Sequence, residues 1–244
     1  MATNTETSAI VPALYLIPVE LGDVPHSHIL PAANHDIVCS IRHFAVEDVR
    51  SARRFLRRVD AAFDIDGATF YLMGKHADAA VYAECLKPLE QGLSVGVISE
   101  AGCPAVADPG ADIVALAQRR GLKVVPLVGP SSMLLAVMAS GLGGQSFAFT
   151  GYLPIDDAER ERCIRRLEKR AWDERQTQLF IETPYRNIRM FAHLLRVLKP
   201  QTRLCVAAAI TTPDEYIRTR TVAEWRRHAQ PDIDRKPAIF LIGR

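Results

Sequence analysis

Cysteine is scarce in this 244-residue sequence, and the few cysteines are not spaced as metal ligands or disulfide partners. There are five, scattered along the chain: Cys39, Cys85, Cys103, Cys163 and Cys205. Because the number is odd and no CxxC pair occurs, the sequence predicts neither a disulfide scaffold nor a zinc finger or redox couple. The histidines between His26 and His43 are irregularly spaced with no cysteine pair nearby, so we expect no metal site.

A long uncharged hydrophobic segment suited to a membrane is also absent. The longest apolar run, Val124–Phe149, is interrupted by glycine, proline, serine and glutamine, which predicts a strand, a turn and a short helix. The first ten residues lack a basic flank followed by an apolar core, so we expect no secretory signal and a cytoplasmic location. With 48% hydrophobic and 24% charged residues, the composition excludes a disordered chain.

What the sequence does contain is an alternation of β-branched runs and helical patterns. This alternation is typical of an α/β fold with mainly parallel sheets. The pattern restarts near Val128, which predicts two α/β domains, residues 1–127 and 128–244. Charge divides at the same point: 11 basic and 15 acidic residues give the first half −4, whereas 19 and 13 give the second half +6. Arginine dominates the second half, and its bidentate contacts with phosphate make an RNA or phosphate partner one interpretation.

The expected elements follow from these periodicities. The predicted strands are Ala13–Val19, Asp36–Ile41, Ser94–Ser99, Leu122–Leu127, Ser146–Thr150, Gln178–Glu182, Arg203–Ala209, Glu215–Thr221 and Ala238–Ile242. The predicted helices are Val46–Val59, Ala77–Gln91, Ala111–Arg120, Ser131–Ser140, Asp157–Ala171 and Asn187–Leu198. Ligands of open α/β sheets bind beyond the carboxyl ends of the strands, so the loops that follow the strands are the candidates for function.

The segment Ser99–Gly110 is the most informative of these loops. Gly102 and Gly110 permit unusual backbone angles, and Glu100 and Asp108 supply carboxylates. Twelve residues with two acidic side chains are more than a connection needs, which favours a binding loop. We also expect Asp108 to cap the helix that begins nearby.

Two further loops are candidates. In Val128–Ser132, the free N–H groups and hydroxyls at a helix start suit a polar ligand, although capping by Ser131 would equally account for them. In Glu182–Arg186, charged side chains follow a strand and suit a substrate cleft. None of the loops is a Walker loop or a GxGxxG fingerprint, so nucleoside triphosphates and dinucleotides are not favoured.

The predicted helix Asp157–Ala171 is rich in arginine. Its basic residues alternate with glutamates. The pattern is typical of a salt-bridged surface and equally of a face that contacts RNA, and the sequence leaves both interpretations open.

Four motifs occur in a familiar order and spacing: residues 100–110, 125–131, 151–154 and 182–186. Together they resemble the tetrapyrrole methylase-like superfamily, and within it the branch of small-subunit ribosomal RNA (rRNA) ribose 2′-O-methyltransferases that act on a cytidine. The resemblance implies two α/β domains and S-adenosylmethionine (SAM) in the cleft between them. It also implies a homodimer and an RNA partner in the small ribosomal subunit.

The resemblance further assigns cofactor contacts by position. They are Leu21 in the first turn, Ala101, Gly102, Cys103, Pro104 and Val106 in the loop around the methionine part, Ser131, Ser132 and Met133, and finally Ala208, Ala209, Pro237 and Ala238 around the adenine.

The implied reaction is attack of an acceptor oxygen on the sulfonium methyl group, which needs alignment and a proton acceptor but no metal. Glu100, and after it Glu47, is the expected activating carboxylate, and Arg50 and Arg186 are the expected substrate anchors. Two alternatives stay open: methylation of a tetrapyrrole or another small molecule, and a sensor or assembly factor that binds SAM without turnover.

Overall fold

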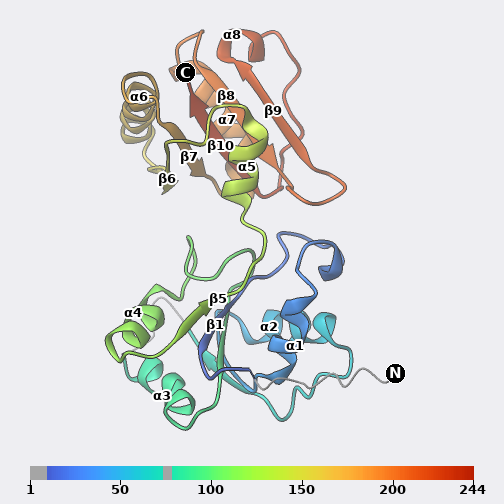
Figure 1. Ribbon diagram of the computed structural model, residues 1–244. Helices are drawn as coiled ribbons and strands as arrows, with labels where there is room; N and C mark the ends of the chain where they lie inside the picture. The colour runs from blue at the N-terminus through green and yellow to red at the C-terminus, as the bar shows by residue number, and fades with distance from the viewer. Residues whose placement is uncertain (1–9, 74–78) are drawn as a thin grey trace. The chain divides into compact units, whose positions relative to one another are not determined.

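The computed structural model describes residues 10–73 and 79–244 of the chain (Figure 1). The chain divides into two compact units, Met1–Pro130 and Ser131–Arg244. This division falls after Pro130, whereas the sequence analysis placed the boundary after Leu127. In the described residues each unit has its own five-stranded sheet, and each combines that sheet with helices. The predicted α/β class with two sheets is confirmed.

The sheet of the first unit is parallel throughout. Its strand order is β3-β2-β4-β1-β5, and the strands are β1 (Leu14–Ile17), β2 (His43–Val46), β3 (Thr69–Leu72), β4 (Val95–Ile98) and β5 (Val124–Pro126). A helix follows each of the first four strands, namely α1 (Ala33–Ser40), α2 (Val49–Val59), α3 (Ala79–Glu90) and α4 (Ala111–Arg119). A helical crossover is the connection that parallel neighbours require.

These helices cover both faces of the sheet (Figure 1). On one face, α1 and α2 pack against the strands through Val38, Phe55 and Leu56. On the other face, α3 and α4 pack through Leu86 and Ile113. Both faces of β4 are therefore buried, which explains why its sequence is uniformly apolar.

Two predictions near the start of the chain are wrong. Asp36–Ile41 was expected to be a strand, but most of it belongs to α1, because Asn34, Val38 and Ile41 are buried at helical spacing. The helix expected from Val46 begins at Val49, since the carboxylate of Asp48 accepts the Ser51 N–H and caps it. The preceding residues form β2.

The strand β3 was missed by the sequence analysis. It lies at the sheet edge, and its residues are half-buried or exposed, so the apolar pattern that marks a buried strand is absent. The helix predicted from Ala77 begins outside the described residues and is described from Ala79.

The second unit has a mixed sheet in the order β6-β7-β10-β8-β9. Its strands are β6 (Phe147–Tyr152), β7 (Thr177–Ile181), β8 (Arg203–Ala208), β9 (Tyr216–Thr221) and β10 (Ala238–Gly243). Among the described strands of this unit, only β6 and β7 are parallel neighbours. The expectation of mainly parallel sheets therefore holds for the first unit and not for this one. The short segment 209–215 joins β8 to β9, and a connection without a helix allows only an antiparallel pair.

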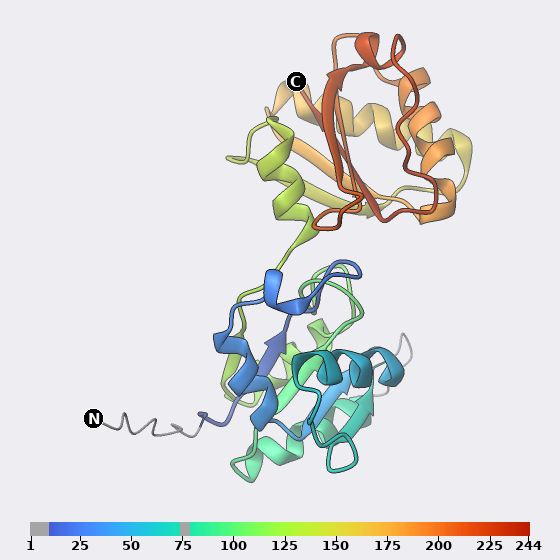
Figure 2. The ribbon, with the colours of Figure 1, turned by 90° about the vertical axis from the view of Figure 1, so that its right-hand side faces the viewer.

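The helices of the second unit are α5 (Ser132–Ser140), α6 (Asp157–Asp173), α7 (Asn187–Val197) and the short α8 (Val222–Trp225). Helices α6, α7 and α8 enclose the main core with the sheet, through residues such as Ile164, Phe191 and Trp225. Helix α5 contacts β8, β9 and β10, and Figure 2 shows α5 and α7 on opposite sides of the sheet. None of the helices within the described ranges is long and apolar enough to cross a membrane.

Candidate functional site

The carboxyl edge of the first sheet gathers the loops that the sequence analysis singled out. Strands β2, β4 and β1 are neighbours and run in the same direction. The segments that follow them, which contain Glu47, Ser99–Gly110 and Val19–Asp23, therefore emerge side by side at one edge.

The loop after β4 is held to the segment after β1 by a pair of backbone hydrogen bonds. The Val19 N–H donates to the Gly102 carbonyl at 2.9 Å, and the Gly102 N–H donates to the Val19 carbonyl at 3.1 Å. Gly102 has φ +70°, and a Cβ on it would lie 3.2 Å from the Leu21 side chain. The Cys103 thiol, whose pKa is raised by burial, donates to the Pro130 carbonyl at 3.3 Å. The structure thus brings together the predicted residues Leu21, Gly102 and Cys103.

The remainder of this loop contains alanines in a backbone conformation that favours glycine. Ala105 has φ +66° and Ala107 has φ +65°. A left-handed conformation costs about 1 kcal/mol for a residue with a Cβ. Such strain persists where the surroundings fix the backbone, and it is concentrated at ligand-binding loops. Ala101, Pro104 and Val106 belong to the same segment, and Val106 is exposed whereas Pro104 is buried.

Three carboxylates share the carboxyl edge. The Glu47 side chain accepts the Glu100 N–H at 3.4 Å. Burial and the Asp108 carboxylate raise the pKa of Glu47. Burial also raises the pKa of Asp108, against a hydrogen bond from the Ser99 hydroxyl that lowers it. A carboxylate with a raised pKa accepts a proton more readily near neutral pH, so this geometry suits a general base.

The sequence ranked Glu100 before Glu47 as the activating carboxylate. The burial of the two side chains favours the opposite order. The Glu100 side chain is exposed, whereas Glu47 is half-buried. Asp108 does not cap α4, because the N-cap residue is Gly110 and it makes no side-chain capping bond in the described structure.

A depression of about 410 Å³ lies beside these loops, within the first unit. Its walls come from the segment after β1, from α2 and from the start of the loop after β4, and they include Arg54, Arg58, Glu20 and Glu100. Glu20 is buried and pairs through Oε2 with Arg58 Nη2 at 3.0 Å. Its Oε1 atom has no partner within the described residues. The depression is therefore polar, with cationic groups on its wall.

Helix α2 presents a dense row of arginines next to this depression. Five of its eleven residues are arginine and none is acidic: Arg50, Arg53, Arg54, Arg57 and Arg58. Four of them, from Arg53 to Arg58, line a second shallow depression. Arg50, a predicted substrate anchor, is exposed in the first turn. The helix is thus a cationic surface adjoining the carboxylate loops.

The second unit brings together another predicted group at the start of β10. Ala238 pairs with Ala208 in the sheet, and the Ala209 N–H donates to the Pro237 carbonyl at 2.9 Å. Ala209 has φ +49°. The next residues lead to a pocket of about 330 Å³ between α5 and β9, where the Thr211 hydroxyl is buried without a partner in the described structure.

The start of α5 contains the predicted residues Ser131, Ser132 and Met133. Ser131 occupies the N-cap position but makes no side-chain capping bond within the described chain. Capping therefore does not account for this serine, and its hydroxyl stays available. The three residues are half-buried.

Arg186, the other predicted anchor, is held at the end of β7. Its Nε and Nη2 atoms donate to Glu182 Oε1 at 3.0 and 2.7 Å, and the same oxygen accepts the Thr183 N–H. Glu182 is buried, so the pair fixes the direction of the guanidinium group.

The basic residues of α6 are mostly paired with acidic residues of the same helix or just beyond it. Arg165 pairs with Glu161 at 2.8 Å and Arg170 with Glu174 at 3.4 Å. Arg160 pairs with Asp157, and Lys169 with Asp173. Of the two interpretations left open by the sequence, this arrangement favours the salt-bridged surface.

Comparison with known proteins identifies relatives over nearly the whole chain. A family model of tetrapyrrole (corrin/porphyrin) methylases matches residues 28–225. A ribosomal RNA small subunit methyltransferase I of Vibrio cholerae is 31% identical over 242 residues, covering 99% of this chain and 80% of the relative. A protein of the same name from Mesorhizobium japonicum is 30% identical over 249 residues, covering 100% and 80%.

Solved structures show the same fold. The methyltransferase CobJ aligns with a TM-score of 0.62 at 18% identity, covering 95% of this chain and 94% of that one. A uroporphyrin-III C-methyl transferase from Thermus thermophilus, complexed with S-adenyl homocysteine, aligns with a TM-score of 0.53 at 17% identity, covering 95% and 97%.

Proposed function

The chain belongs to the tetrapyrrole (corrin/porphyrin) methylase family, and on that premise we propose that it is a SAM-dependent methyltransferase acting on a ribose 2′-hydroxyl of small-subunit rRNA. The observation that carries this proposal is the match of both units, at 30–31% identity, to relatives named ribosomal RNA small subunit methyltransferase I. The arginine surface beside the carboxylate loops supports a polyanionic acceptor over an apolar one.

The residues present fit SAM. In the first unit, Gly102 and the left-handed alanines expose backbone near Leu21, and an added Cβ at Gly102 would crowd that side chain. In the second unit, the Ser131 hydroxyl makes no capping bond, and the apolar pocket beyond Ala209 contains the Thr211 hydroxyl, which has no partner among the described residues. A mostly apolar pocket with one hydroxyl suits a purine. When bound, SAM supplies an electrophilic methyl group. The proposed cofactor contacts are Leu21, Ala101, Gly102, Cys103, Pro104, Val106, Ser131, Ser132, Met133, Ala208, Ala209, Pro237 and Ala238.

The chain's own task is then to align the acceptor hydroxyl and accept its proton. Glu47 fits the proton acceptor better than Glu100, because burial and neighbouring carboxylates raise the pKa of Glu47 and the Glu100 N–H fixes its side chain. Arg50 and Arg186 remain the proposed anchors for RNA phosphate. General base catalysis contributes typically about 10²- to 10⁴-fold in rate.

We further assign RNA docking to the exposed side of α2. Its arginines carry charge without acidic partners on the same helix, whereas those of α6 are largely paired. Neutralising phosphates with arginine releases counterions and supplies the sequence-independent part of RNA affinity.

The test is transfer of tritiated methyl groups from SAM to small-subunit particles, naked rRNA and a metabolite extract. We expect label in rRNA, in a dinucleotide that resists alkaline cleavage because its 2′-oxygen is blocked. Glu47→Gln should lower the rate at least about 100-fold with SAM affinity unchanged in calorimetry.

The alternatives give other outcomes. Label in a tetrapyrrole or another small molecule would replace the rRNA assignment, and SAM binding without transfer to any acceptor would indicate a sensor or assembly factor. Full activity of both Glu47→Gln and Glu100→Gln would exclude the proposed base. The homodimer and the cytoplasmic location stay predictions, and sedimentation equilibrium measures the first.

A further inference from the structure

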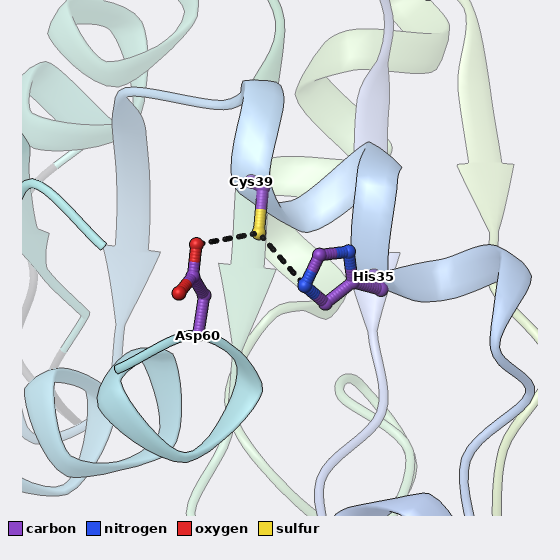
Figure 3. Close-up of side chains that lie close together, drawn as sticks. All are labelled: His35, Cys39 and Asp60. Carbon is purple, nitrogen blue, oxygen red and sulfur yellow. Dashed lines mark hydrogen bonds between the residues drawn. The ribbon is translucent and has the colours of Figure 1, made fainter. Parts of the chain in front are cut away.

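Outside these loops, three side chains with metal-binding atoms meet where α1 packs beside α2 (Figure 3). His35 and Cys39 lie one turn apart on α1, and Asp60 follows the last residue of α2. The sequence of most of this segment favours a strand. In a strand, residues four apart are separated by roughly 13 Å, so the pair could not form a site.

The distances fit a small cation. Cys39 Sγ lies 3.7 Å from His35 Nε2 and 4.0 Å from Asp60 Oδ2. All three ligand atoms lie within 4.8 Å of one another. Tetrahedral zinc, with bonds of about 2.3 Å to sulfur and about 2.0–2.2 Å to nitrogen and oxygen, places ligand atoms roughly 3.3–3.6 Å apart. Small side-chain rotations close the difference, because His35 is half-exposed at 47%.

Neighbouring groups orient two of these atoms toward the common point. His35 Nδ1 lies 2.9 Å from Asp36 Oδ1, so this carboxylate holds the Nδ1 proton and leaves the Nε2 lone pair facing Cys39. Asp60 accepts the Ala62 N–H through Oδ1 at 2.8 Å, which leaves Oδ2 toward the thiol. A carboxylate behind a histidine is the usual support of a metal ligand in proteins.

We propose that His35, Cys39 and Asp60 bind one zinc-type divalent ion, with the fourth position open to water. Thiolate and imidazole favour zinc or cobalt over magnesium or calcium, which prefer oxygen ligands alone. The ion would join the last turn of α1 to the end of α2. Since α1 has only eight residues and its N-cap, Ala32, has no capping side chain, such a link would stabilise it. The site differs from the proposed catalytic loops.

Titration of the reduced, chelator-treated full chain with Co²⁺ tests the site. We expect one ion per chain with a thiolate-to-cobalt charge-transfer absorption that Zn²⁺ abolishes by displacement. Cys39→Ser should abolish the absorption. His35→Gln should remove high-affinity binding, and Asp36→Asn should weaken Zn²⁺ binding about 10- to 100-fold. His28→Gln removes an exposed histidine outside the cluster and serves as the matched control.

Far-ultraviolet circular dichroism establishes that each variant is folded. An absence of cobalt absorption in the wild-type chain would overturn the proposal. Absorption that persists in folded Cys39→Ser would also overturn it, because another cysteine would then be the ligand. The readout is metal binding alone, so its result is independent of methyl transfer.

Discussion

Helix α2 of the first unit and helix α6 of the second unit both contain many arginines, but only α6 also contains acidic residues. In α2 five arginines occur without an acidic residue, which gives the helix a charge of +5. In α6 six basic residues stand among five acidic ones, which leaves +1. Arginine content alone would rank the two helices together. What distinguishes them is whether the same helix supplies the counter-charges.

The two helices are otherwise alike in construction. Asp48 caps α2 by accepting the Ser51 N–H, and Asp156 caps α6 by accepting the Glu159 N–H. Each also uses one arginine internally, Arg58 toward buried Glu20 and Arg160 toward the Ile155 carbonyl. Because both helices have an aspartate N-cap and one arginine bonded to the rest of its unit, matched variants of the two helices can distinguish a loss of RNA contact from a loss of helix stability.

The largest expected effect is on RNA affinity. Replacing Arg53, Arg54 and Arg57 together by glutamine should weaken binding of small-subunit rRNA at least about tenfold. The slope of log affinity against log salt should fall by about 3, because each lost phosphate contact removes roughly one unit. Filter binding at several salt concentrations measures both quantities.

The matched control removes the same charge from α6, through Arg162→Gln, Arg165→Gln and Arg166→Gln. These side chains lie on the helix that supplies its own counter-charges, and we expect less than about a twofold change in rRNA affinity and an unaltered salt slope. Equal losses in both triple variants would contradict the assignment of docking to α2. Calorimetry with SAM shows whether either triple variant has altered the cofactor site.

The next effect is on the free energy of unfolding and concerns Arg58 of α2 and Arg160 of α6, the arginines that bond to other parts of their units. Arg58→Gln leaves the Glu20 carboxylate buried without its cationic partner and should cost about 1–3 kcal/mol, since Arg58 itself is 44% exposed. Arg160→Gln, at a side chain that is 7% exposed, should cost about 2 kcal/mol. Urea unfolding measures both losses, and Arg162→Gln should stay within about 0.5 kcal/mol of wild type. A loss below that level for Arg58→Gln would show that Glu20 has other support.

The contrast between the two helices also shows what the sequence could predict. The candidate binding loop was predicted because Gly102 and Gly110, together with two carboxylates, follow the end of a buried strand, and such a segment is typical of ligand binding. The sequence did not decide whether the arginines of α6 are paired, because alternating charges fit a salt-bridged face and an RNA-binding face equally. Only the distances between the side chains distinguish the two interpretations.

Other features depended on contacts far apart in the chain. Burial of Glu20 requires Arg58, which lies 38 residues later, so no local pattern marks it. The proposed metal-ligand set was not found from the sequence because Asp36–Ile41 was predicted as a strand. A run of apolar β-branched residues fits a strand, and only the burial of Asn34, Val38 and Ile41 reveals helical spacing.

A smaller loss of stability, equal for the two helices, is expected from replacing their N-cap residues. Asp48→Ala and Asp156→Ala should each cost about 1 kcal/mol, because each removes the acceptor of an N-terminal backbone N–H. The Ser51 N–H lowers the pKa of Asp48, so its contribution is present above the unfolded pKa of about 3.9 and is lost as the pH falls through the lower folded value. Urea unfolding at about pH 7 and about pH 3 measures this change. Unequal losses of stability for the two variants at the higher pH would show that the two N-caps are not equivalent.

The smallest effect concerns His193 of α7, which lies beside Arg160 of α6 and Arg196 of its own helix. Burial, Arg160 and Arg196 lower the pKa of His193, against Asp157 and Glu161, which raise it. A lowered folded pKa means that the unfolded chain binds this proton at higher pH. The contribution of neutral His193 to stability is therefore fully present above the unfolded pKa of about 6.5, and it declines as the pH falls below that value.

Between about pH 7.5 and 5.5 this decline should reach about 1 kcal/mol or less, and His193→Gln should flatten it. Melting temperatures measured across that range in wild type and variant provide the comparison. Burial is the main cause of the lowered pKa of His193, and Arg160 Nη2 and Arg196 Nη2, which lie 3.4 and 3.3 Å from His193 Nδ1, add to it. An unaltered pH dependence in His193→Gln would show that another group causes the decline in stability.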